Sequence, residues 1–327
     1  MKFSKVILLI AVILLAASCT AGRDGDLTPA DLDHIRLPMG YVPNVQYAPF
    51  YTAVDKGFYA EEGIELEFDY SYETDGVALV GANELQFSLV SGEQVPIARA
   101  EGIPIVYVMA WYGEYPIAVI AKSDQNLQTP QDLAGKRIGL PGLFGANYVG
   151  LRALMGYAGL DESDLTLESI GFTQVEALAA GTSPVVVGYI ANEPVQLAAL
   201  GYDLDILRVS DYLELVSNGL ITNEKTIAEN PDLVRRMIRA TLRGIQYAVE
   251  HPQEAYEHCL NHVDGLEDAD QEVQFQVMES SLAIYQTDPY GFSSPEAWSN
   301  MQDVLLDMGL MKTPIDLEEA YTNDFIQ

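Results

Sequence analysis

The sequence holds few cysteines and few basic residues, and each shortage excludes a class of protein. Its 327 residues include 2 cysteines, Cys19 and Cys259, so we expect no intramolecular disulfide. Lysine and arginine total 17 against 48 aspartates and glutamates, which gives a formal charge of -31 at pH 7. A surface this acidic repels phosphate backbones and anionic lipid, so we expect no nucleic-acid partner.

The sequence also lacks the motifs of common enzyme classes. It has no phosphate-binding loop, no Gly-x-Ser-x-Gly elbow and no His-Glu-x-x-His zinc motif. The 4 histidines lie outside the segments expected to form a cleft, and although His258 and His262 flank Cys259, no dense set of metal ligands surrounds them. We therefore expect no catalytic residue, no metal and no cofactor.

No long apolar run is present, but a shorter one follows the first residues. Lys2 and Lys5 precede an apolar run over residues 6–17, which is shorter than the ~20 residues that span a bilayer. Ser18-Cys19 follows at once, so residues 1–19 have the form of an export signal. Residues 20–33 are a polar tether. We expect the mature protein to work outside the cytoplasm.

The end of this signal resembles the lipobox of bacterial lipoproteins, in which the cysteine becomes the lipidated first residue. The match covers residues 15–19, although Ala16 stands where a large aliphatic residue is usual. The alternative is an ordinary secretory signal with an incidental cysteine. The lipobox interpretation predicts a globular protein anchored to a membrane through Cys19.

The remaining chain is long enough for two folded lobes, and a hydrophobic content of 49% supports complete folding. Extended apolar stretches alternate with stretches of helical period, which predicts an α/β fold with mostly parallel sheets flanked by helices. We predict strands at residues 35–39, 64–70, 85–90, 103–111, 116–122, 137–140, 165–170, 185–189 and 219–222. We predict helices at residues 51–62, 76–82, 94–101, 148–158, 174–180, 194–200, 231–250, 253–260, 272–285 and 296–308, with a helix start at 129–136.

Two extended crossings, near residues 116–122 and 215–223, divide the chain into a hinged clamshell. Lobe 1 comprises residues 34–118 and 219–327, lobe 2 comprises residues 119–218, and the helical tail is expected to pack on lobe 1. In open α/β sheets a ligand binds beyond the carboxyl ends of the strands. We therefore expect a cleft between the lobes that closes around a ligand.

Several short motifs resemble one family. Gly40-Tyr41-Val42-Pro43-Asn44, residues 48–53 and residues 56–64 are similar to the opening of ABC-importer solute-binding proteins in the group related to thiamine-pyrimidine synthases. Residues 127–142 resemble the second-lobe entry of that group, and residues 189–194 resemble its cleft motif. The resemblance covers residues 35–325. It implies a type II periplasmic-binding-protein fold and a monomer that passes a small heterocycle to an ABC permease.

The resemblance leaves the ligand open, because such relatives bind formylaminopyrimidine, riboflavin, or alkyl sulfonates and taurine. A sulfonate site needs hydroxyls, backbone N–H groups and often arginine. The loops expected at the cleft carry aromatic and acidic residues instead, which favours a flat, uncharged heterocycle: a thiamine-pyrimidine precursor or riboflavin. These residues are Tyr47, Phe50, Glu73, Asp75, Glu93, Trp111, Tyr112, Phe144, Tyr148, Phe172, Tyr189 and Glu193.

Other functions remain as alternatives. One is a sulfonate- or taurine-binding protein, and another is a sensor domain without a permease. A third is an enzyme like the eukaryotic relatives, which make the thiamine pyrimidine with a histidine, a lysine-bound cofactor and iron. The absence of histidine from the expected cleft loops disfavours the enzyme.

Glu193 is the strongest candidate for a ligand contact, because it matches the pyrimidine-contacting glutamate of the resembled family. An acidic residue beside Pro194 could instead stabilise the start of a helix.

Asn218-Gly219 is interpreted as hinge geometry. The full set of predicted ligand-binding residues is Asn44, Gln46, Tyr47, Glu93, Trp111, Phe144, Asn147, Tyr189, Asn192 and Glu193.

The other candidates have alternatives of their own. Asn44 and Gln46 could present amides to the ligand or form the turn after Pro43. Tyr47 and Tyr189 could stack on the ligand or pack in the core. The segment from Phe144 to Asn147 could offer helix N-terminal amides to an oxygen or make a turn.

Overall fold

The computed structural model describes residues 32–326. The predicted signal peptide, the lipobox with Cys19 and nearly all of the tether lie outside these residues, so they stay predictions. Within residues 32–326, no helix has both the length and the apolar character needed to cross a bilayer.

The strands form sheets of different size. β1 pairs with β2, β10 lies between β3 and β4, and a larger sheet has the order β7-β6-β8-β5-β9. The strands are β1 (Asp33–Gly40), β2 (Ile64–Tyr72), β3 (Ser88–Val90), β4 (Ile105–Ala110), β5 (Ile117–Lys122), β6 (Arg137–Leu140), β7 (Thr166–Ser169), β8 (Val185–Tyr189), β9 (Leu204–Arg208) and β10 (Gly219–Asn223).

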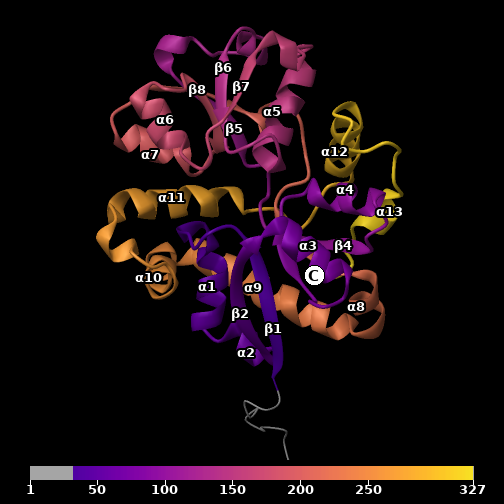
Figure 1. The fold of residues 1–327 in the computed structure, drawn as a ribbon. Coiled ribbons are helices and arrows are strands. Elements are labelled where there is room, and N and C mark those ends of the chain that lie inside the picture. Colours follow the sequence, from indigo (N-terminus) through magenta and orange to yellow (C-terminus); the bar gives the residue numbers. More distant parts are fainter. Residues whose placement is uncertain (1–31, 327) are drawn as a thin grey trace, which may run out of the picture. The chain divides into compact units, whose positions relative to one another are not determined.

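Helices cover the sheets and fill the carboxyl-terminal third of the chain (Figure 1). They are α1 (Ala48–Asp55), α2 (Phe58–Glu61), α3 (Glu73–Gly81), α4 (Gln94–Ala100), α5 (Gly145–Ala158), α6 (Gln174–Ala180), α7 (Glu193–Ala199), α8 (Glu224–Glu229), α9 (Pro231–Glu250), α10 (Pro252–His262), α11 (Gln271–Ile284), α12 (Pro295–Asp307) and α13 (Leu317–Ala320). Short 3-10 turns include η2 (Val45–Tyr47) and η4 (Pro130–Leu133), the latter where a helix start was predicted.

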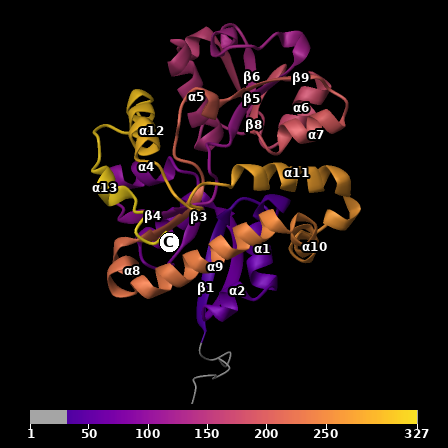
Figure 2. The same cartoon turned by 180° about the vertical axis from the view of Figure 1, so that it is seen from behind.

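The elements form two lobes within residues 33–326. Lobe 2 contains the five-stranded sheet with α5, α6 and α7, and lobe 1 contains the other sheets with the helices around them (Figures 1 and 2). The chain passes between the lobes twice, over residues 111–116 before β5 and residues 209–218 before β10. The predicted boundary at residue 118 falls inside β5, and the one at 218 falls just before β10.

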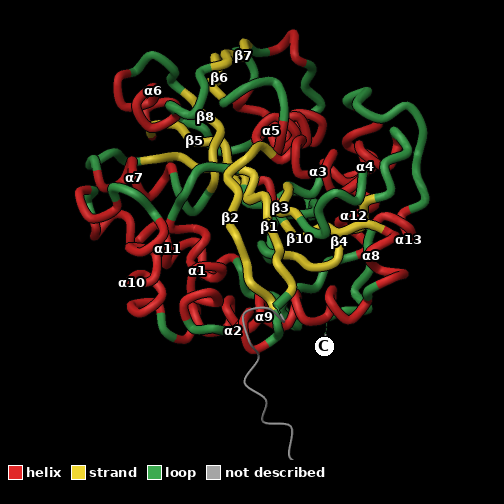
Figure 3. The backbone as a smooth tube through the Cα atoms, turned by 60° about the horizontal axis from the view of Figure 1, so that its bottom comes forward, coloured by secondary structure: helices red, strands yellow, loops and turns green. Residues whose placement is uncertain are grey.

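The strand directions differ in part from the predicted mostly parallel sheets. β1 and β2 are parallel, as are β6 with β7 and β6 with β8. β5 runs antiparallel to both of its neighbours, and so does β10. Each follows a connection between the lobes, so it enters its sheet without the helical crossover that makes neighbouring strands parallel. The five-stranded sheet is therefore mixed, whereas the β1–β2 sheet is parallel and the β3-β10-β4 sheet is antiparallel. Figure 3 shows the strands in yellow among the surrounding helices.

The inner strand β5, which lies between β8 and β9, shows how lobe 2 is stabilised. Its side chains alternate between the two faces of the sheet, with Ile117 and Val119 in one apolar core and Ala118 and Ile120 in the other. All of these side chains are buried. A strand that is apolar on both faces belongs in the middle of a sheet covered by helices on each side, which is the place that β5 occupies.

The tail helices contact both lobes, whereas the sequence predicted packing on lobe 1. α9 packs closely on α1 because Gly244 has no side chain, and a Cβ there would lie 2.3 Å from the Pro49 carbonyl oxygen. α11 contacts η2 in lobe 1 and also α7 in lobe 2, and α12 contacts α5. The α1–α9 contact holds the loop before α1, which contributes to the site described below.

Candidate functional site

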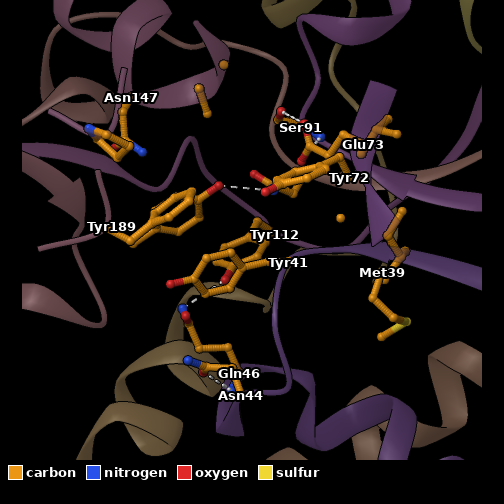
Figure 4. Close-up of a pocket in the computed structure, with 18 of the residues that line it drawn as sticks. Met39, Tyr41, Asn44, Gln46, Tyr72, Glu73, Ser91, Tyr112, Asn147 and Tyr189 are labelled. Carbon is orange, nitrogen blue, oxygen red and sulfur yellow. Dashed lines mark hydrogen bonds between the residues drawn. The ribbon is translucent and has the colours of Figure 1, made fainter. Parts of the chain in front are cut away.

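A cavity of about 470 Å³ lies between the two lobes. It is lined by residues that follow β1, β3, β4, β6 and β8, together with Asn218 just before β10. In Figure 4, Tyr189 and Asn147 face the cavity from one side, and Tyr72, Glu73 and Ser91 face it from the other. The cavity therefore has the position that the strand directions predict, beyond the carboxyl ends of the strands.

Aromatic rings form the inner wall of this cavity. The ring of Trp111 stacks on Tyr47, with centroids 5.1 Å apart and an interplanar angle of 19°. Tyr112 meets Trp111 edge to face at 4.7 Å, and Tyr189 lies 6.1 Å from Tyr112. Burial raises the pKa of Tyr47, Tyr112 and Tyr189 well above the ordinary value for tyrosine, so these phenols are uncharged at neutral pH.

Hydrogen bonds fix the first-lobe loop under this wall. The Asn44 side chain accepts a hydrogen bond from the Gln46 N–H at 2.9 Å and so caps η2. The Gln46 amide donates to the Tyr112 hydroxyl at 3.0 Å, and the Tyr47 hydroxyl donates to the Met39 carbonyl at 2.8 Å. Asn44 therefore makes the turn that the sequence left as one alternative, and its side chain also lines the cavity.

Glu193 joins the end of β8 to the start of α7. Its Oε2 accepts a hydrogen bond from the Tyr189 N–H at 2.8 Å, and the residue also lines the cavity. Burial raises the pKa of Glu193 to about 7, although the hydrogen bonds to its carboxylate act in the opposite direction. Gly188 makes room for this side chain, because a Cβ there would lie 2.6 Å from the Glu193 carboxyl carbon.

Gly188→Ala is expected to displace Glu193 and to destabilise the protein by about 1–3 kcal/mol, because the added methyl group overpacks a closed site. Urea unfolding of the purified variant measures this loss. Gly156→Ala in α5 is the matched control, since a Cβ at that position meets nothing within 4 Å. Equal stability of the two variants would show that Glu193 does not depend on the absence of a side chain at position 188.

A second acidic group lies on the lobe 1 side of the cavity. Glu73 accepts hydrogen bonds from the Ser91 N–H at 2.9 Å and from the Ser91 hydroxyl, whose oxygen lies 2.5 Å from Glu73 Oε2. The same hydroxyl oxygen lies 2.7 Å from Glu93 Oε1. The sequence predicted a ligand contact for Glu93, but this residue does not line the cavity and lies behind Ser91 at 1% exposure. Its position at the start of α4 turns the side chain inward.

Several polar atoms of cavity-lining residues have no protein partner. They are Trp111 Nε1, Asn147 Oδ1 and Asn218 Oδ1, all buried. Asn218 also donates through Nδ2 to the Tyr189 hydroxyl at 3.2 Å, so this residue belongs to the site and not only to the hinge that the sequence predicted. A buried polar group without a partner costs about 1–3 kcal/mol, and a ligand that carries both donors and acceptors would relieve this cost.

The charge of the cavity wall is one-sided. Among the described residues that line it, Glu73 and Glu193 are acidic, and none is lysine, arginine or histidine. This wall offers no cationic partner to a phosphate, sulfonate or carboxylate. Within residues 32–326, no cluster of histidine, cysteine, aspartate and glutamate has the arrangement of a metal site.

The structure brings most of the predicted residues to the cavity. Those that line it are Asn44, Gln46, Tyr47, Trp111, Phe144, Asn147, Tyr189, Asn192 and Glu193. Their contacts with a ligand stay predictions. Three of the other aromatic and acidic loop residues lie elsewhere: Phe50 is in the core, Asp75 is exposed, and Tyr148 donates a hydrogen bond to Glu162.

Sequence reasoning missed Tyr41 and Tyr72, which also line the cavity. Tyr41 of lobe 1 meets Phe172 of lobe 2 edge to face, with ring centroids 5.1 Å apart. Tyr41 belongs to the Gly40–Asn44 motif and Tyr72 directly follows a predicted strand, so their positions at strand ends could have signalled a role.

The two-lobed α/β fold with a cavity between its lobes is that of periplasmic binding proteins. A solved structure of the periplasmic aliphatic sulphonate-binding protein SsuA from Escherichia coli superposes with a TM-score of 0.69 at 10% sequence identity, covering 88% of this chain and 91% of that one. The family model described as NMT1/THI5 like matches residues 44–255. The chain belongs to this family, which confirms the resemblance and the predicted fold class.

Three relatives match the chain over two thirds or more of its length. The chain is 36% identical to the riboflavin-binding protein RibY of Chloroflexus aurantiacus, with coverage of 100% of this chain and 98% of RibY. It is 28% identical to the formylaminopyrimidine-binding protein of Halalkalibacterium halodurans, with coverage of 99% of each. A 4-amino-5-hydroxymethyl-2-methylpyrimidine phosphate synthase of Legionella pneumophila is 29% identical over 68% of this chain and 72% of the synthase.

Proposed function

We propose that this chain is the extracytoplasmic solute-binding component of an ABC importer, and that it binds a flat, uncharged vitamin or vitamin precursor between its lobes. The observation that carries this proposal is the cavity wall, in which stacked aromatic rings adjoin buried carboxyls without a basic side chain among the described residues. Aromatic rings stack on a planar ligand, and carboxyl oxygens accept hydrogen bonds from its N–H groups. The similarity to two binding proteins along the whole chain supports the same function.

Riboflavin is the ligand that we propose first, and formylaminopyrimidine is second. The wall formed by Tyr47, Trp111, Tyr112 and Tyr189 suits the large isoalloxazine ring, and the riboflavin-binding relative shares more identical residues with this chain than the pyrimidine-binding relative does. The Glu193 carboxyl group could accept a hydrogen bond from either ligand, since a flavin imide and an aminopyrimidine both carry N–H donors. A sulfonate fits less well because no cationic side chain faces it.

We further propose that the protein is a monomer anchored through Cys19 and that it delivers its ligand to a membrane permease. The two connections between the lobes, residues 111–116 and 209–218, would act as the hinge. They carry Trp111, Tyr112 and Asn218 of the cavity wall, so ligand contact and lobe closure would be coupled. The wall has no histidine or cysteine among its described residues, which supports binding over the enzymatic alternative.

Riboflavin is expected to bind the purified mature protein, to lose its fluorescence on binding and to raise the melting temperature. At a free concentration of 100 times Kd, such a ligand stabilises the folded state by about 2.7 kcal/mol. Fluorescence titration and thermal unfolding measure both effects, and taurine is the control expected to produce no shift. A shift with formylaminopyrimidine alone would reassign the ligand. Failure of both heterocycles would reject the proposed function.

A further inference from the structure

The contacts of Ser91 show that the neighbouring carboxyls hold a proton. Its hydroxyl oxygen lies 2.5 Å from Glu73 Oε2 and 2.7 Å from Glu93 Oε1, and both distances are those of hydrogen bonds. A serine hydroxyl carries one proton and can donate it to one of these oxygens. The other contact therefore needs a proton from the carboxyl group itself.

The remaining contacts assign that proton to Glu93. Glu73 accepts from both the N–H and the hydroxyl of Ser91, which stabilises its ionised form. Glu93 is buried, and its Oε2 has no hydrogen-bond partner. A buried anionic oxygen without a partner is costly, whereas the carbonyl oxygen of a neutral acid costs much less. The three residues therefore form a hydrogen-bond relay. In this relay the protonated Glu93 carboxyl group donates to the Ser91 hydroxyl oxygen, and the Ser91 hydroxyl donates to the Glu73 carboxylate.

The surroundings of this pair favour a single negative charge. The titratable groups that face it are the phenols Tyr47, Tyr115 and Tyr189, all buried. Glu193 is on the opposite wall of the cavity, and no basic residue is among the described residues of that wall. Burial raises the pKa of both coupled carboxyls, and repulsion between the two charges opposes ionisation of the second one. The pair as a whole keeps one proton at neutral pH.

We propose that Glu73 is the lobe 1 carboxylate that accepts an N–H donor of the ligand, and that Glu93 is a positioning residue that donates its proton through Ser91. This inference rests on the proposed function. Glu73 lines the cavity, and Figure 4 shows it beside Ser91. Glu93 is buried behind Ser91, which it contacts through Oε1. The unpartnered Trp111 Nε1 and Asn218 Oδ1 in the same cavity independently indicate an occupant with polar groups.

The relay makes ligand affinity depend on pH. While Glu93 keeps its proton, the site presents one carboxylate to an uncharged ligand. When pH rises and the proton passes to solvent, Ser91 loses a donor and Glu93 gains a charge that repels the Glu73 charge. The affinity for riboflavin is therefore expected to fall between pH 7 and pH 9.

Variants at positions 73 and 93 test this relay by riboflavin fluorescence titration over the same pH range. Glu73→Gln is expected to weaken binding by about tenfold or more, because the ligand donor loses its anionic acceptor. Glu93→Ala is expected to weaken it similarly, because Ser91 loses its donor. Glu93→Gln is expected to restore most of the affinity and to make the fall at high pH smaller than in the original protein, since its amide N–H replaces the carboxyl proton permanently.

Glu101→Gln is the matched control, because Glu101 is an exposed carboxylate beyond the end of the same helix, α4. This variant is expected to keep both the affinity and the pH profile of the original protein. Glu193 is unchanged in all these proteins, so it cannot account for a difference between them. A Glu93→Gln variant whose affinity falls at high pH as steeply as that of the original protein would overturn the relay.

Infrared spectroscopy of the ligand-free protein tests the proton without any ligand. Glu193, whose pKa of about 7 leaves it partly protonated at pH 7, is first replaced by glutamine in every protein compared. In this Glu193→Gln background, the protein at pH 7 is expected to show a carboxylic-acid C=O band that the added Glu93→Gln change removes and the added Glu101→Gln change retains. If this band is lost but neither riboflavin nor formylaminopyrimidine binds, the relay stands and the proposed function fails. If riboflavin binds but the two spectra share the band, the proposed function stands and the relay is rejected.

Discussion

Glu193→Ala is expected to weaken riboflavin binding by about 1–3 kcal/mol, which is roughly a fivefold to 150-fold increase in Kd. Glu193 is buried at the cavity wall, and an N–H group of the ligand would lie against its carboxyl group. Removing the carboxyl leaves that N–H without an acceptor in a site closed to water. Isothermal calorimetry on the purified variant measures the loss of affinity.

The control for this experiment is Glu176→Ala, which removes an exposed carboxylate from α6 in the same lobe. It is expected to bind riboflavin with unchanged affinity. Circular dichroism should show that Glu193→Ala stays folded, because the change removes one side chain at the rim of the lobe 2 core. A folded Glu193→Ala protein with unchanged affinity would exclude Glu193 from ligand recognition and leave it the single role of closing the turn between β8 and α7.

The ligand-free protein is expected to lose stability as pH rises from about 5 to about 8. Burial raises the pKa of Glu193 to about 7, above the value of 4.5 for a free glutamate. Burial also raises the pKa of the coupled Glu73–Glu93 pair, which keeps one proton while Glu73 stays ionised. Between these limits the folded state binds more protons than the unfolded state, so the free energy of unfolding falls as pH increases. Each such group contributes a slope of up to about 1.4 kcal/mol per pH unit. Their contribution is fully present below about pH 4.5.

Urea unfolding at intervals of pH measures this slope. Glu193→Gln is expected to flatten the curve below pH 7, and Glu93→Gln is expected to flatten it at higher pH, because an amide does not titrate. Glu101→Gln should leave the curve unchanged, since that carboxylate is exposed. Parallel curves for the original protein and the Glu193→Gln and Glu93→Gln variants would mean that neither Glu193 nor the Glu73–Glu93 pair holds a proton in the folded state.

The architecture could be predicted to a large extent because it follows from local patterns. The strand at Val185–Tyr189 and the helices at Gln174–Ala180 and Pro231–Glu250 begin and end where the sequence predicted. Apolar periodicity and flanking glycine, proline and asparagine mark such ends within a few residues. The strand β9 and the helices α8 and α13 escaped prediction because they are short and carry little periodic signal.

Part of the site could be predicted for the same reason. Tyr189 ends a strand, and Trp111 and Glu193 follow strands, so an α/β fold alone places them at one edge. The tertiary structure was needed for the partners of each side chain. Trp111 stacks on Tyr47 although the two residues are far apart in the chain, and Tyr41 meets Phe172 from the other lobe. No local pattern encodes such pairs.

The sequence by itself determined the alternation of strands and helices, the family and the aromatic and acidic character of the site, because these depend on residue types and their spacing along the chain. The tertiary structure decided the mixed strand directions, the close approach of Gly188 to Glu193 and the burial of Glu93 behind Ser91. Burial and proximity between distant segments set the protonation of a carboxyl group, and both arise only when the chain has packed.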